Sequence, residues 1–595
     1  MRTLRPKTVP MGSVAPWLIV GGVGGVYALG LLAWLAARIA AVLSGHSWAT
    51  GPAFGTRFIS GLLRGRAAQM LPGVPAWLIA TVFTVLLAAA IALVVVGWRL
   101  IARRLPRPDD PLASLATPEQ VAPLTPPVIA DRARRLRPSL AGLPRESLPP
   151  EETGVLLGTL QPRGPELRAS WEDVMVAIMA PRSFKSTALA IPTVLAAPGP
   201  VVATSNKADL WAATVELRTE GARQAWVFDP QSIVFAHQDW WWPALDGVTT
   251  VEEAERLAGH FILNVDDPQR RDIWGPGATE LLSALVLAAG ISGRSLTEVY
   301  LWLVDDGSPE PVDILESRPE FSAQAKGLRG IQNTAPETKQ GLYVTARIGA
   351  RCLRDPQIMK WVTPPPSGTL ATFDPRKFVQ SRDTLYLLSK DGGGSAAPLI
   401  AALADRVMRE AVRRAETRGG RLDPPMPVVL DEAANICRIA DLPTLYSHLG
   451  SRGVLPVTIL QSWAQGETVW GRAGMEALWG AATVKLIGSG IDDDRLGERL
   501  SRLVGPHDVA VTSYSRGGRD RTLSESVTLR QQPILGPHRV RELRKGTALL
   551  LATGCRAAQI ALRPWFDGPQ ADRIRAAEAA AIKDLTTRAE RHLSP

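Results

Sequence analysis

The chain has 595 residues, 46% of them hydrophobic, which is long enough for several domains whose cores need no disulfides. Its three cysteines, Cys352, Cys437 and Cys555, are widely spaced, which excludes a disulfide framework and a cysteine-based metal cluster and fits a reducing compartment. Eleven of the 67 Lys and Arg residues lie in residues 1–107, which hold no Asp or Glu, so the remainder balances 56 basic against 57 acidic residues. The formal net charge of +10 therefore comes from the flanks of the apolar N-terminal segments and does not indicate a general DNA-coating surface, so any nucleic-acid site must be local.

Two N-terminal segments, residues 13–37 and 74–98, carry no charge and are each long enough to cross a bilayer. A cleaved signal peptide fits the first segment poorly, because its apolar run is too long and a second one follows. Basic residues gather before the first segment and after the second, which favours both ends on the cytoplasmic side. We therefore predict a membrane anchor over residues 1–104, in a multi-pass protein of the inner or plasma membrane whose bulk is cytoplasmic.

Residues 105–150 are rich in Pro, Arg and Ala, a composition that predicts a semi-rigid linker. Short apolar strands then alternate with helical patterns, which predicts an α/β sheet that is mostly parallel and covered on both faces. Ordered structure is expected to resume near 154–158, and the strands expected in this first part, residues 151–247, lie near 174–179, 200–204 and 225–229.

Residues 248–360 show helical patterns without clear strands and predict an inserted all-α subdomain. The second part of the sheet domain, residues 361–566, has further expected strands at 384–388, 427–432, 456–461 and 482–487, a helix at 396–416 and β-type alternation from 508. Residues 567–595 predict a charged helix and tail. The run Trp240–Trp242 is expected to be buried against the insertion rather than to stack on bases.

The segment VMVAIMAPRSFKSTALAIPTV, residues 174–194, has the strand–loop–helix pattern of a phosphate-binding loop, in which a lysine and a following hydroxyl meet phosphate and Mg²⁺. The usual pattern is G-x-x-x-x-G-K-[ST], but Met179 and Phe184 occupy the glycine positions before Lys185. Taken alone, the segment also fits an ordinary loop with Ser or Thr capping a helix.

A second motif, the apolar strand Val428–Leu430 followed by Asp431 and Glu432, has the form of a Walker B motif. The aspartate would face Mg²⁺ and the glutamate an attacking water, although two acids also commonly end a solvated strand. Gln461 closes the next expected strand, where a γ-phosphate sensor could sit, and Arg452 precedes that strand as a possible arginine finger for a neighbouring subunit.

Four stretches together resemble the conjugative DNA-transfer coupling proteins of type IV secretion, the TraG/TraD-like ATPases. They are APRSFKST, VVATSNKADL, LDEAANICRIADLPTLYSHLGSRGVLPVTILQSWAQ and LWGAATVKLIGSGIDDDRLGERLSRLVG, within residues 180–505. The resemblance implies a membrane-anchored, RecA-like P-loop NTPase that forms hexamers and has an all-α subdomain inserted between its two Walker motifs.

The resemblance also implies ATP and Mg²⁺ as cofactors. Nucleotide would contact Ala180, Pro181, Arg182, Ser183, Phe184, Lys185, Ser186 and Thr187. Ser186 and Asp431 would hold the metal, Glu432 would be the catalytic base, Gln461 the sensor and Arg452 the finger in trans. The family's P-loop glycines do not carry over, which places hydrolysis in question more than fold or partners.

The expected function is to recruit DNA with a bound relaxase or other transfer protein and to pump it toward membrane proteins of the secretion channel. The alternative is a docking protein of the same fold that does not hydrolyse ATP, and a chromosome-partitioning translocase of the FtsK type is a third possibility. Non-specific contact with single-stranded or duplex DNA is assigned to the arginine-rich stretch near residues 514–530, with Arg516, Arg519, Arg521 and Arg530 as candidates. A charged hairpin tip would have the same composition.

Overall fold

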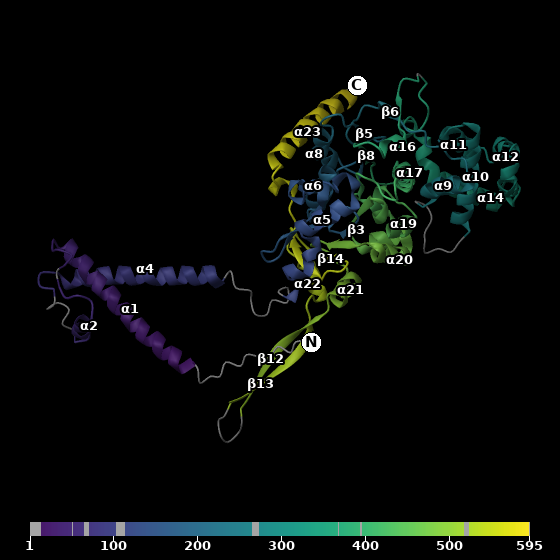
Figure 1. Ribbon diagram of the computed structural model, residues 1–595. Helices are drawn as coiled ribbons and strands as arrows, with labels where there is room; N and C mark the ends of the chain where they lie inside the picture. Colours follow the sequence, from purple (N-terminus) through teal and green to yellow (C-terminus); the bar gives the residue numbers. More distant parts are fainter. Residues whose placement is uncertain are drawn as a thin grey trace. The chain divides into compact units, whose positions relative to one another are not determined.

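The structure is a computed structural model that describes residues 14–49, 51–64, 71–102, 114–263, 273–366, 368–392, 395–516 and 523–593 (Figure 1). The chain divides into two compact units, residues 1–110 and 111–595. The second unit, called the body below, contains every motif that the sequence singles out for nucleotide or DNA.

The first unit consists of apolar helices, α1 (Val14–Leu43), α2 (Thr56–Leu63) and α4 (Ala76–Ala102). Small residues of α1, among them Ala37 and Ala40, pack against Phe58 and Val74 in a core of their own. Residues 24–43 and 76–99 are long and apolar enough to cross a membrane. The same holds for residues 274–292 in the body, but 61% of that window is buried in the protein. The two predicted apolar segments are thus confirmed as helices.

An eleven-stranded sheet forms the centre of the body. In spatial order its strands are β2 (Glu166–Ser170), β1 (Gly154–Leu160), β15 (Ala558–Ala561), β14 (Thr547–Ala552), β11 (Val484–Ile487), β3 (Met175–Ile178), β10 (Val454–Leu460), β9 (Met426–Leu430), β4 (Val201–Ser205), β8 (Thr384–Leu388) and β5 (Ala225–Phe228). The run from β11 to β5 is parallel, whereas β14, β15, β1 and β2 join antiparallel at one edge. The predicted mostly parallel α/β sheet is confirmed.

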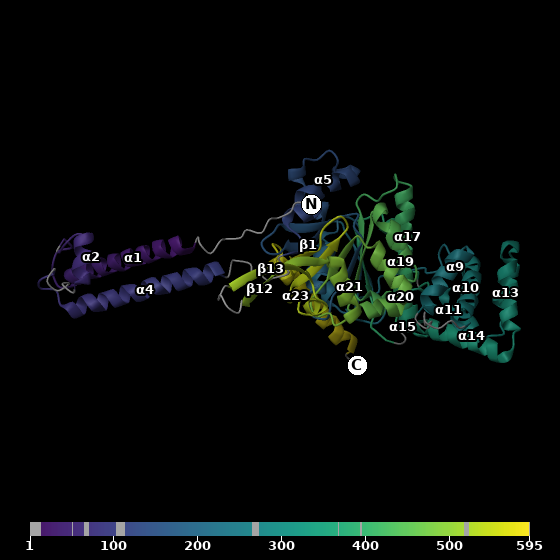
Figure 2. The same cartoon turned by 90° about the horizontal axis from the view of Figure 1, so that it is seen from below.

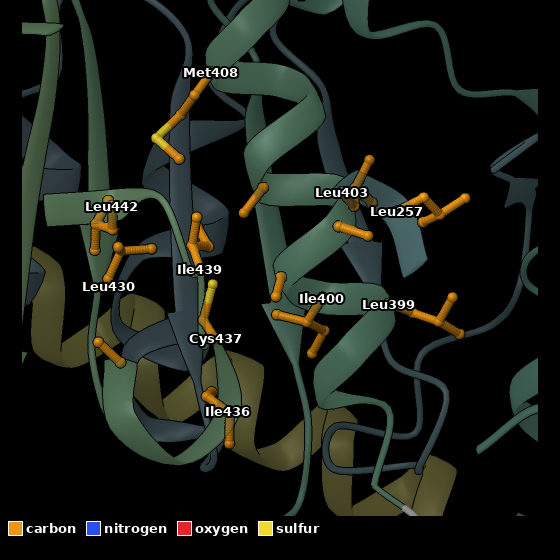
Figure 3. Close-up of a cluster of buried hydrophobic side chains, with 14 of the residues drawn as sticks. Leu257, Leu399, Ile400, Leu403, Met408, Leu430, Ile436, Cys437, Ile439 and Leu442 are labelled. Carbon is orange, nitrogen blue, oxygen red and sulfur yellow. The ribbon is translucent and has the colours of Figure 1, made fainter. Parts of the chain in front are cut away.

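Each face of the sheet has its own hydrophobic core, because successive side chains of a strand point to opposite faces. In β3, Val176 and Ile178 enter one core, and Met175 and Ala177 enter the other. Helix α17 (Ala397–Glu416) lies over the first face, and its Ile400 belongs to the same buried cluster as Ile436 and Ile439, which follow β9 (Figure 3). Helices α8 (Asp209–Arg218) and α23 (Ala571–Leu593) lie together on the second face (Figure 1).

The inserted region contains helices only, α9 (Val251–Ile262), α10 (Trp274–Ser292), α11 (Leu296–Val304), α12 (Glu310–Glu316), α13 (Ser322–Gln332), α14 (Pro336–Gly349) and α15 (Pro356–Met359), with short 3₁₀ turns among its described residues. They form a lobe beside α17 at one end of the body (Figure 2). Trp240 of β6 (Trp240–Trp241) is 1% exposed at the base of this lobe, where its ring meets those of Trp361 and Phe373. The expected burial of this tryptophan run is confirmed for Trp240 and Trp242.

The Pro-rich region expected as a linker differs from that expectation after residue 113. It forms η3 (Pro118–Leu124), α5 (Pro126–Leu136) and α6 (Pro150–Thr153), which pack on the body. Pro118, Pro126 and Pro150 stand at first helical positions, where a missing N–H costs nothing. Arg137, 3% exposed, joins this segment to the body through Asp423, with Nε 3.1 Å from Oδ1. Composition alone could not show these contacts.

The β-type alternation from residue 508 belongs to two different structures. Strands β12 (Pro506–Arg516) and β13 (Leu523–Pro533) pair as a separate antiparallel hairpin, while β14 and β15 join the main sheet. The expected C-terminal helix is α23.

Candidate functional site

The parallel strands β3, β10 and β9 are neighbours in the sheet, and their carboxyl ends lie on the same side of it. This side is called the carboxyl edge of the sheet. The chain leaves β3 into the loop before Lys185, leaves β10 at Gln461, and leaves β9 at Asp431 and Glu432. Because the carboxyl ends of parallel strands meet at one edge, these groups are brought together although they are far apart in sequence.

The site is a buried network of charges. The Lys185 ammonium contacts Glu432 Oε1 and lies 3.8 Å from Asp431 Oδ1. Gln461 Nε2 donates to both carboxylate oxygens of Glu432 at 2.8 Å. The side chains of Asp431 and Glu432 are 5% and 7% exposed, so Lys185 is a cation that compensates two buried carboxylates. The predicted phosphate, metal, base and sensor residues therefore do share one site.

Asp431 has the surroundings of a metal ligand. Ser186 Oγ donates to its Oδ2 at 3.1 Å, and Thr204 Oγ1 fixes its backbone carbonyl at 2.8 Å. Its Oδ1 is buried without a hydrogen-bond partner, and burial raises the pKa of this carboxyl to about 6 despite the nearby ammonium of Lys185. One hydroxyl, one carboxylate and further oxygens from phosphate and water are the ligand set that Mg²⁺ prefers. These residues fit a magnesium ion.

The phosphate-type loop reaches a glycine-like backbone without glycine. Phe184 has φ 72° and ψ 20°, and Arg182 has φ 63°, both in the left-handed region. A non-glycine residue there costs about 1–2 kcal/mol, so the surroundings of Phe184 must hold it. The helical turn η6 (Lys185–Ala190) begins directly afterwards, and its first N–H groups have no partner within the helix and suit an anion.

Met179, at the other missing glycine, is fully buried at the end of β3. Its neighbour on the next strand is Gly488, where an added Cβ would lie 3.0 Å from Met179 Cγ. Similarly, a Cβ on Gly490 would lie 3.3 Å from that of Ala180. Gly488 and Gly490 thus leave room for the side chains of Met179 and Ala180, where the usual loop has a glycine of its own. In the sequence, the signal of this arrangement is the GSG run at 488–490.

The remaining loop residues divide between surface and interior. Pro181 and Arg182 are exposed, whereas Ser183 is buried and its hydroxyl donates to Ala180 O at 2.5 Å. Thr187 Oγ1 is 3.5 Å from Phe184 O, which ties the helix start back to the loop.

Asn435 is a site residue that our sequence reasoning did not assign. Its Nδ2 donates to Glu432 Oε2 at 2.9 Å from the short helix α18 (Ala433–Ile436). Glu432 itself has φ 57°, a left-handed conformation that costs free energy and is found mostly at functional sites. The signal was the asparagine three residues after the glutamate, a spacing that places both side chains on one side of a helical turn.

Arg452 does not reach the site of its own chain. It ends η9 (Gly450–Arg452) just before β10 begins, at the opposite edge of the sheet from Lys185, and its guanidinium pairs with Glu416 at 3.3 Å. Of the DNA-contact candidates, Arg530 is exposed in β13, opposite Val509 of β12. Arg516 ends β12, but its side chain, together with Arg519 and Arg521, lies outside the described residues.

Strand order and site chemistry define one class. A lysine–hydroxyl loop and an acidic pair, separated by a strand that ends in a glutamine, give the body the RecA-like fold and motif arrangement of P-loop NTPases. The comparisons agree: the bacterial conjugative coupling protein TrwBdeltaN70, in an unbound form, is similar with a TM-score of 0.50 at 17% identity, over 68% of this chain and 88% of that one. A TrwB structure in complex with ADP and Mg²⁺ is similar with a TM-score of 0.48 at 16% identity, over 68% and 89%.

Sequence comparison points to proteins of conjugal transfer. The family described as the TraM recognition site of TraD and TraG matches residues 425–545. The conjugal transfer protein TraG of Agrobacterium fabrum (strain C58 / ATCC 33970) is 23% identical over 397 residues, which are 64% of this chain and 59% of TraG, so the chain spans less than two thirds of that relative. Together these matches support a likeness to the type IV secretion coupling proteins, and the resemblance seen in the motifs is confirmed.

Proposed function

We propose that this coupling protein is a membrane-anchored ATPase that binds ATP with Mg²⁺ and uses hydrolysis to move DNA, with bound protein, toward a transfer channel. The observation that carries the proposal is the buried network at the sheet edge, in which Lys185, Asp431, Glu432 and Gln461 meet from three strands. Compared with apolar residues of similar volume, two carboxylates and a lysine buried together gain little stability, because desolvation offsets their attraction. Their juxtaposition has a chemical use.

Each residue has a role that follows from its contacts. Lys185 exchanges its contact with Glu432 for the phosphates when nucleotide enters. Ser186 and Asp431 would hold Mg²⁺, which would supply positive charge beside the phosphate oxygens. Glu432 then accepts a proton from the attacking water, and Gln461 and Asn435, which already donate to its carboxylate, keep that group oriented.

Assembly and partners are part of the proposal. Helices α1 and α4 would span the inner membrane with the body on the cytoplasmic side, and six chains would form a ring in which Arg452 reaches the nucleotide of the next subunit. The position of Arg452, away from its own site and 33% exposed at its side chain, supports a role in trans. The segment 425–545 would meet a relaxosome protein, and the β12–β13 hairpin would contact DNA phosphates.

A docking protein that does not hydrolyse ATP is the second candidate. It is favoured by Met179 and Phe184, since both glycines that usually shape a phosphate loop are replaced. Against it stand the left-handed backbone at Phe184 and the glycines facing Met179, which keep the loop's geometry.

The test is ATP binding and steady-state turnover by the detergent-solubilised chain, with and without single-stranded DNA. Glu432→Gln should abolish turnover and leave ATP bound, because it removes the base and keeps the volume. Glu320→Gln, at an exposed position of the inserted lobe, is the matched control and should change neither. Turnover that survives Glu432→Gln would rule out the base role, and a wild-type chain that binds no ATP would leave the docking function.

A further inference from the structure

The ring of Phe184 sits in a niche built by the far C-terminal part of the body. Phe566 meets it edge-on, with ring centroids 5.9 Å apart and planes at 72°. The ammonium of Lys545 lies over the ring, 4.8 Å from its centroid. Gly546, at φ 82°, turns the chain here, and an added Cβ would lie 3.4 Å from Phe184 Cε2. The loop before β14 and the turn after β15 thus enclose the residue that precedes Lys185.

These contacts act on the conformation of the loop. A left-handed phenylalanine is unfavourable by itself, and rotation of its backbone to an ordinary φ would carry the ring out of the niche. Edge-to-face aromatic packing and a cation over a ring both depend on geometry, so they favour the one backbone conformation that seats the ring. Since Phe184 directly precedes Lys185, that conformation also sets where the first N–H groups of η6 point.

We propose that Phe566 and Lys545 form a clamp that holds Phe184 in the left-handed conformation and so replaces the missing glycine of the phosphate loop. Both are positioning residues, which act through Phe184. The consequence for ligand binding rests on the proposed function, in that the ligand of this loop is a nucleotide phosphate. A chain with glycine at 184 reaches the same backbone unaided and does not need the clamp.

This dependence on residue 184 makes the clamp testable by a double-mutant cycle with Phe566→Ala and Phe184→Gly. In the wild-type background, Phe566→Ala should weaken ATP binding by about tenfold, the upper range for one aromatic pair. In the Phe184→Gly background, the same change should have less than a twofold effect. Lys545→Ala should follow the same pattern with a smaller loss, and Phe321→Ala, a half-buried phenylalanine of the inserted lobe, is the control.

A second readout without nucleotide separates the clamp from the proposed function. The unfolding midpoint of the full chain in detergent should fall more on Phe566→Ala when residue 184 is phenylalanine than when it is glycine. Equal losses in the two backgrounds would overturn the clamp, whether or not ATP binds. If the fall in the unfolding midpoint depends on residue 184 but no variant binds ATP, the proposed function is overturned and the clamp still stands. If Phe566→Ala does not fold, Phe566→Leu keeps most of the volume and removes the ring edge.

Discussion

Replacing Lys185 by alanine is expected to destabilise the nucleotide-free protein, and not only to weaken nucleotide binding. Lys185 compensates the buried carboxylates of Asp431 and Glu432. For Asp431 alone, a separation of 3.8 Å gives an attraction of about 4 kcal/mol at an effective dielectric constant of about 20. Removal of one partner from a buried pair typically costs about 3–5 kcal/mol. We therefore expect the free energy of unfolding to fall by about 4 kcal/mol.

Urea unfolding of the body, followed by tryptophan fluorescence at pH 7.5 without nucleotide, measures this loss. Lys326→Ala, at an exposed lysine of the inserted lobe, is the control and should stay within about 0.5 kcal/mol of wild type. Lys185→Ala combined with Glu432→Gln should recover most of the loss, because one unpaired charge is then removed. If Lys185→Ala is as stable as the control, or if the second change adds to the loss, the lysine does not compensate the acids and the reasoning is refuted.

Two further predictions concern contacts that precede the parallel strands β9 and β10 in the chain. Burial raises the pKa of Asp423, but hydrogen bonds from Ser139 and the ion pair with Arg137 outweigh it and leave that pKa below 3.8. The stabilisation by this ionised carboxyl is therefore present above pH 3.8 and is lost as the pH falls further. The difference in unfolding free energy between wild type and Asp423→Asn should shrink through that range. A constant difference would contradict the ion-pair assignment. Gly450→Ala should cost about 2 kcal/mol by overpacking, because its Cβ would lie 2.3 Å from the carbonyl oxygen of Glu172. Gly480→Ala, whose Cβ would meet nothing within 4 Å, should cost nothing, and equal unfolding midpoints of the two variants would count against the close approach.

Much of the sheet could be predicted from sequence because its strands are short, apolar and bounded by turn residues. The strand expected at 384–388 is β8 residue for residue, and the helix expected at 396–416 differs from α17 by one residue. The meeting of the motif residues could also be predicted, since the carboxyl ends of parallel strands lie on the same side of a sheet. Lys185, Asp431, Glu432 and Gln461 meet as that reasoning requires.

Other features depend on contacts between residues that are distant in sequence, and no local pattern contains them. In the sequence Phe184 is only a departure from the phosphate-loop pattern, because its packing against Phe566 joins residues that are far apart in the chain. The same holds for Met179, because its neighbour Gly488, which follows β11, is about 300 residues away in the chain. The pairing of β1 with β15 likewise joins opposite ends of the body. The trans role of Arg452 and the DNA-contact arginines stay predictions.

The position of β3 in the sheet has a consequence for how the protein is made. Its two neighbours, β10 and β11, come from the last third of the chain, roughly 300 residues after β3. At a synthesis rate of about 5–20 residues per second, the apolar strand Met175–Ile178 waits about 15–60 s for a partner. Such non-local pairing slows folding and leaves strand edges exposed meanwhile. The ribosome-bound chain should therefore be a strong client of chaperones until β11 has emerged.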